Sequence, residues 1–160
     1  MSAKSWMSYL SLLFGCICLV IFVDLHTLTP MNSMHSDPTN IGRLLLYPGW
    51  SMLAALLLFT FVFAVRYFDA LEDYIAKLSY HSLVPFLSSC TLLLSFFLQL
   101  RKLKHTLTSL RTDAESMPVF DSIGLVNAYT ASLFFNAHIV LFWLSFSILA
   151  GWWVVQKRKN

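Results

Sequence analysis

Three carboxylates lie close together in the middle of the chain, at Asp69, Glu72 and Asp73. Asp69 and Asp73 would share one face of a helix, as two carboxylates that work together in catalysis must. No Asp-Gly pair, His-x-x-x-x-Asp motif or Arg/His phosphate clamp accompanies them. Lys77 follows Asp73 at the i,i+4 spacing of an ion pair on a helix surface. The sequence therefore favours a solvated helix surface over a lipid-modifying enzyme, which remains the second alternative, and it predicts no catalytic residue.

The cysteines and histidines form no recognisable ligand pattern. Cys16 and Cys18 are two residues apart, which places them on opposite faces of a helix, and Cys90 is isolated in another apolar run. The histidines do not follow the spacing of a metal site. Only His138 falls inside an apolar run, so two histidines at matching depth, as a membrane haem would need, are not expected. We predict neither a metal nor a cofactor.

Asn136 and His138 are the most polar residues inside any of the apolar runs. Polar groups in hydrocarbon are costly and usually face other helices. We therefore predict that these two side chains make interhelical polar contacts that hold neighbouring helices together. A second interpretation places Asn127, Asn136 and His138 along a path through a channel or transporter formed by several copies of the chain.

The composition indicates that these residues lie on membrane helices. The chain has 160 residues, of which 58% are hydrophobic and only 12% charged, with a mean hydropathy of +0.67. A soluble domain has roughly 25% charged residues, so lipid is the simplest environment for this surface. Four apolar runs approach the ~20 residues that cross a bilayer as a helix: 6–23, 44–65, 83–100 and 133–155. The cations form no basic stripe of the kind that binds nucleic acid.

These runs predict an all-α fold: a single transmembrane domain over residues 1–160, built as an antiparallel four-helix bundle. Pro48 and Gly49 predict that the regular part of the second helix starts near Tyr47. The third and fourth helices are expected to extend beyond the bilayer, the third with leucines through residue 110 and the fourth from residues 121–123 onward. Each run also holds two small residues four positions apart, which lets helix backbones approach closely: Ser11/Gly15, Ser51/Ala55, Thr91/Ser95 and Ser147/Gly151.

The second helix is also expected to continue past its apolar run, from residue 66 to residue 78. Apolar residues recur there at helical spacing, and this stripe is a candidate surface for binding a partner: Phe68, Leu71, Ile75 and Leu78. A helix of this kind would leave the membrane without a break.

The C-terminal end predicts the orientation. Two tryptophans followed by three cations are typical of the water-facing end of a membrane helix, and the cations favour the cytoplasm: Trp152, Trp153, Lys157, Arg158 and Lys159. The number of cations on each side of the membrane hardly favours either orientation, because six Lys or Arg residues lie on the side of the termini and five on the other. We expect cytoplasmic termini in a eukaryotic plasma membrane or endoplasmic reticulum (ER), with Lys157 and Arg158 as a weaker candidate signal for ER retrieval.

The function favoured by these features is that of a non-enzymatic accessory or assembly subunit of a larger membrane complex. The expected partners are the lipid bilayer and other membrane proteins, with no nucleic acid. The channel- or transporter-forming homo-oligomer is the first alternative. It is disfavoured because no Asp, Glu, Lys or Arg lies within the four apolar runs to bind or select ions.

Overall fold

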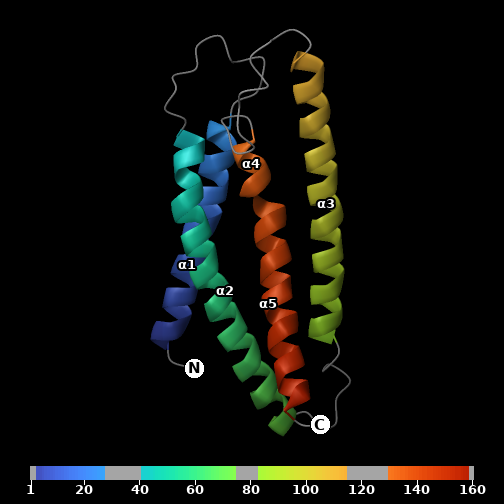
Figure 1. Cartoon of the computed structure of the whole chain (residues 1–160). Coiled ribbons are helices and arrows are strands. Elements are labelled where there is room, and N and C mark those ends of the chain that lie inside the picture. Colours follow the sequence, from blue (N-terminus) through green and yellow to red (C-terminus); the bar gives the residue numbers. More distant parts are fainter. Residues whose placement is uncertain (1–2, 28–40, 75–82, 115–129, 159–160) are drawn as a thin grey trace.

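The computed structural model describes residues 3–27, 41–74, 83–114 and 130–158, and nearly all of them are helical. The helices are α1 (Ala3–His26), α2 (Ile41–Tyr74), α3 (Leu83–Ala114), α4 (Ala131–Phe134) and α5 (Ala137–Lys157). Figure 1 shows the long helices side by side, running alternately in opposite directions, with both chain ends at the same end of the molecule. The all-helical fold class is confirmed.

Four segments are long and apolar enough to cross a membrane: Lys4–His26, Leu44–Ala70, Leu83–Ser109 and Ala131–Lys157. The four predicted membrane helices are therefore confirmed. At about 1.5 Å per residue, the 34 residues of α2 and the 32 residues of α3 give lengths of roughly 51 and 48 Å. A hydrocarbon core is only about 30 Å thick. The extension of the third and fourth helices beyond the bilayer stays a prediction.

Two expected helix boundaries were wrong. The second helix does not start near Tyr47 but at Ile41, and it carries Pro48 inside it. The fourth helix does not run unbroken into its apolar run, because the backbone is extended at Phe135 and Asn136, between α4 and α5. The earlier start of α2 places Leu46 in the buried core. The break is stable because side-chain partners satisfy the backbone groups that it frees, as hydrocarbon requires. The expected start of that helix at 121–123 lies outside the described residues.

The helices contact one another in the order α1, α2, α5, α3, and the short α4 touches α1, α2 and α3. The larger core cluster, beside α4, joins residues of α1, α2, α4 and α5, among them Cys16, Leu53 and Phe135. A smaller cluster towards the chain ends joins α2 and α5 through Ala64, Phe68 and Val155. At the α4 end, α1 and α3 are joined by an ion pair between Lys102 Nζ and Asp24 Oδ1, 3.0 Å apart.

Gly151 of α5 lies directly against α2. A Cβ atom added there would lie 2.7 Å from Ala64 Cβ and 3.2 Å from the backbone N of Val65. Ser147, one turn away, is buried in the same helix. The Ser147/Gly151 pair therefore lets α5 lie directly on the backbone of α2.

Replacing Gly151 with alanine should destabilise the protein by about 1–3 kcal/mol, the usual cost of overpacking a tight contact. The backbone of α2 cannot move aside without disturbing the whole helix. Gly15→Ala is the matched control: its Cβ would meet only the end of the Met52 side chain, which can rotate away. The measurement is thermal unfolding in mild detergent, and equal melting temperatures for the two variants would contradict the close α2–α5 contact.

Candidate functional site

The break between α4 and α5 is the most polar buried feature among the described residues. Asn136 is 3% exposed and stands at the N-cap of α5 with an extended backbone (φ −152°, ψ 173°). Its Oδ1 accepts hydrogen bonds from the backbone N–H groups of His138 (2.9 Å) and Ile139 (3.1 Å). The first N–H groups of a helix lack intrahelical partners, and an Asn side chain at the N-cap satisfies them.

The other half of the Asn136 amide satisfies the end of α4. Its Nδ2 donates to the carbonyl of Ser132 (2.8 Å) and to Oε1 of Gln99 on α3 (2.9 Å). Gln99 Nε2 in turn donates to the carbonyl of Leu133 (2.9 Å). Two side-chain amides therefore bind the free ends of two helices and join them to a third helix. The orientation of both amides follows, because each nitrogen faces a carbonyl.

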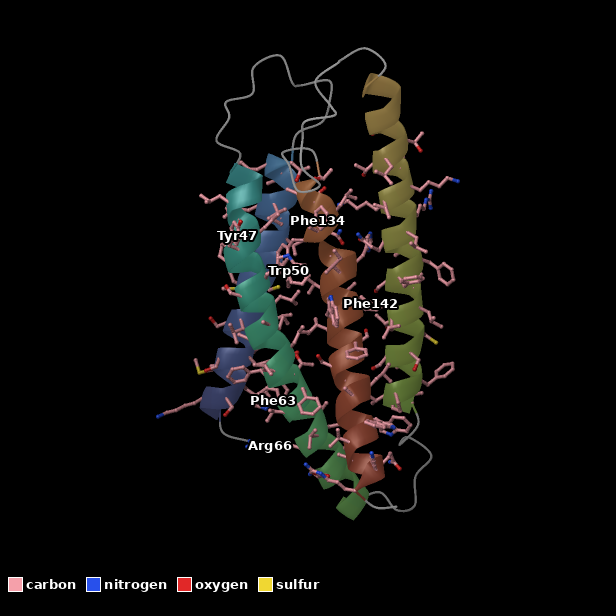
Figure 2. The ribbon with its side chains drawn as sticks, in the orientation of Figure 1. Tyr47, Trp50, Phe63, Arg66, Phe134 and Phe142 are labelled. Carbon is pink, nitrogen blue, oxygen red and sulfur yellow. The ribbon has the colours of Figure 1, made fainter. Side chains whose placement is uncertain are left out.

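Phe135 anchors the same break to α2. Its ring is fully buried, and a Cβ on Gly49 would lie 3.1 Å from the nearest atoms of that ring. Trp50 lies beside it, with ring centroids 6.4 Å apart; Figure 2 shows Trp50 and Phe134 close to the junction of α2, α4 and α5. The glycine at position 49 is needed here because the aromatic ring occupies the place of a side chain.

The two predicted polar residues have different surroundings. Asn136 contacts Gln99 of a neighbouring helix, whereas His138 is half-buried and its imidazole forms no hydrogen bond with any residue that the structure describes. Gln99 was missed, although it is the one amide side chain in the apolar run 83–100. The rarity of amide side chains in an apolar run could therefore have identified Gln99 as a candidate. Asn127 lies outside the described residues.

Phe68, the first residue of the predicted partner-binding stripe, is buried and is not available to a partner. This side chain is 2% exposed and packs in the cluster with Ala64 and Val155, against partly buried Trp152 of α5. Its ring is covered because α5 continues alongside α2 as far as Lys157. The structure does not describe the side chain of Leu71. Ile75 and Leu78 lie outside the described part of the chain.

The other predicted residues lie near the chain ends and do not gather into one site. Asp69 is exposed, 3.9 Å from Arg158, while the side chains of Glu72 and Asp73 are not described. Trp153 is exposed, with Lys157 Nζ 5.2 Å from its ring centroid. Trp152 is half-buried, and its buried Nε1 has no hydrogen-bond partner among the described residues. Lys159 lies outside them.

No protein-family model, curated protein or solved structure matches this chain. Its four apolar helices nevertheless give it the build of an integral, multi-pass membrane protein. Among residues 3–27, 41–74, 83–114 and 130–158, no three His, Cys, Asp or Glu side chains come close enough to hold a metal ion. The amides of Gln99 and Asn136 are neutral and already bonded to the chain, so the chemistry they supply is positional.

Asn136→Leu removes the cap of α5 and the contact with Gln99, and should lower the free energy of unfolding by about 1–3 kcal/mol. Asn136→Ser keeps an oxygen for the cap but loses the donor, so its cost should be smaller, near the ~0.6–1.7 kcal/mol of a hydrogen bond between membrane helices. His138→Leu should cost less than Asn136→Leu. Thermal unfolding in detergent measures all three.

A double-mutant cycle between Asn136→Ser and Gln99→Leu separates the interhelical bond from the cap. The two changes should cost less together than the sum of the single changes, because they remove the same bond. Strict additivity would show that the two amides do not interact in the folded protein.

Proposed function

We propose that this protein is a non-enzymatic accessory or assembly subunit of a larger membrane complex, and that it binds its partner through the outer face of α2. The observation that carries this proposal is the surface formed by Ser51, Ala54 and Ala55. Ser51 and Ala54 are exposed and Ala55 is half-buried. Large side chains flank this small-residue surface on the same side of the helix, at Tyr47 and Leu58, which are 74% and 68% exposed.

Small residues are characteristic of contacts between membrane helices, because they allow backbones to approach. Two other pairs at this spacing serve that purpose within the chain. Gly151, paired with Ser147, lies against α2, and Ser95, paired with Thr91, is 2% exposed on α3, the helix that packs on α5. Ser51 and Ala54 face away from the chain's own helices and Ala55 is only partly covered by them, so a helix of another protein is the natural occupant.

The outer faces of α1 and α3 are mainly apolar. Their exposed residues are mostly large and apolar, as is typical of surfaces that face lipid chains: Met7, Phe14, Ile21, Phe86, Leu94 and Phe97. A lipid-facing surface needs no close backbone approach. Exposed small residues also occur on these helices, for example Ser11 and Ser89, so the support for protein contact at α2 comes from the grouping of its three small residues between Tyr47 and Leu58.

The alternatives receive less support. A channel needs polar groups that are free to replace the hydration of an ion, whereas the amides of Gln99 and Asn136 bond to the chain itself. Asp69, the one described carboxylate of the three considered for a lipid-modifying enzyme, lies beside Arg158. Both observations favour a role in assembly over transport or catalysis.

A photo-crosslinking amino acid at position 54 tests the proposal in the intact membrane. We expect one discrete adduct with another protein, to be identified by mass spectrometry. The same amino acid at position 94, on the outer face of α3, is the matched control and should give lipid adducts only. Ser51→Leu with Ala54→Leu, both at exposed positions, should abolish co-purification of the partner and leave the melting temperature of this subunit unchanged.

Two results would contradict the assembly role. An adduct with the mass of two 18.3 kDa chains would instead support the homo-oligomer. Lipid adducts alone at position 54 would show that α2 faces the bilayer and would refute the docking surface.

We also propose that both termini face the cytoplasm, in a eukaryotic plasma membrane or ER membrane. Lys157 and Arg158 directly follow the apolar part of α5, where the preference of cations for the cytoplasmic side acts most strongly. A C-terminal epitope should become accessible to antibody only when the cytosolic side of the membrane is opened. Staining from the other side would invert the topology. Replacing Lys157 and Arg158 with serine then tests retrieval: movement from the ER to the cell surface supports it, and an unchanged location refutes it.

A further inference from the structure

The break between α4 and α5 has no cause in the local sequence. Residues 130–150 contain neither proline nor glycine, the residues that most often kink a helix. Phe135 and Asn136 nevertheless have extended backbones, with φ −145°, ψ 102° and φ −152°, ψ 173°. In hydrocarbon an unbroken helix is favoured, because it pairs its own backbone groups. The break must therefore be held open by contacts with other helices.

Two side-chain amides replace bonds that an unbroken helix would make for itself. In a helix each carbonyl accepts from the N–H group four residues later, so the carbonyls of Ser132 and Leu133 would have backbone partners. In the broken span they accept instead from Asn136 Nδ2 (2.8 Å) and Gln99 Nε2 (2.9 Å). Asn136 Oδ1 likewise accepts from two N–H groups at the start of α5. The broken and unbroken forms thus satisfy the same four groups, and only the broken form needs Gln99 of α3.

The ring of Phe135 distinguishes the two forms. In the broken span it is fully buried against Gly49 of α2. Gly151 marks the side of α5 that faces α2. At about 100° per residue, a helix continued back from Gly151 would carry Phe135 about 160° round its axis, to the side away from α2. An unbroken fourth span would therefore empty the place beside Gly49.

We propose that the break between α4 and α5 is a two-state joint that couples the position of α3 to α2. With the Gln99 amide in reach, the fourth span is broken and Phe135 lies against Gly49. When α3 withdraws this amide, a carbonyl of α4 loses its closest donor, the span closes into one helix, and the ring leaves α2. Trp50, whose ring lies beside that of Phe135, directly precedes Ser51 of the small-residue surface. An effect of the joint on partner binding rests on the proposed function, whereas the two states do not.

NMR of the full-length protein in lipid nanodiscs tests the joint, because the chain contains one Phe-Asn sequence, at Phe135 and Asn136. Labelling phenylalanine carbonyls with ¹³C and asparagine with ¹⁵N gives a single correlation peak, whose carbonyl shift separates helical from extended backbone. The unaltered protein should give the extended shift. Gln99→Leu should move all or part of the intensity to the helical shift. Lys102→Gln is the matched control: it removes the ion pair between α3 and α1 at the same end, keeps both amides, and should leave the peak extended.

A second variant acts on the joint from α2. Gly49→Leu places a side chain where the ring of Phe135 lies and fills the space that the ring would vacate, so it should give the same helical shift with α3 unaltered. An extended peak in both variants would refute the unbroken state. A random-coil peak with unchanged indole N–H peaks of Trp152 and Trp153, near the chain ends, would show local unfolding and also overturn the joint. If one variant fails to fold, the other decides.

Discussion

The constraint on which the rest of this structure depends is that backbone polar groups in hydrocarbon must find partners within the protein. The gap between α4 and α5 frees carbonyls on one side and N–H groups on the other, each costly if left bare. Asn136 and Gln99 bond to four of these groups: the carbonyls of Ser132 and Leu133 and the N–H groups of His138 and Ile139. A break in this place is therefore stable only with α3 beside it, which ties the path of the fourth span to the position of the third.

Close backbone contact is the second constraint, because lipid supplies no hydrophobic force that would press one helix against another. Helix association must then come from complementary shapes that allow close van der Waals contact. Gly151 lies on the backbone of α2 near the chain ends, and Gly49 accommodates Phe135 near the helix break. Each contact uses a missing side chain, one on α5 and one on α2. Both contacts join α2 to the fourth span.

Much of the fold could be predicted from the sequence, because crossing a bilayer imposes a minimum length on every apolar helix. The four spans, and the continuation of α2 as a helix as far as Tyr74, are read from local pattern alone. The helix break could not be predicted in this way. An Asn before an apolar run is a recognised cap, but Asn136 also has apolar residues before it, at Phe134 and Phe135. Its decisive partner, Gln99, is 37 residues away. The burial of Phe68 was missed for the same reason, since only the path of α5 covers it.

The two ends of the molecule differ in how α1 is held to its neighbours. At the α4 end, α1, α2 and α3 all contact α4, and the ion pair between Asp24 and Lys102 joins α1 to α3. That ion pair is partly exposed and contributes little by itself, so the buried amides and Phe135 provide most of the restraint. Towards the chain ends, α1 diverges from α2, and aromatic rings rather than backbones make the contact. Rings of this size hold two helices apart and leave room between them. Towards the chain ends, α1 is thus held to α2 through side chains, whereas α2 and α5 stay in close contact at Gly151.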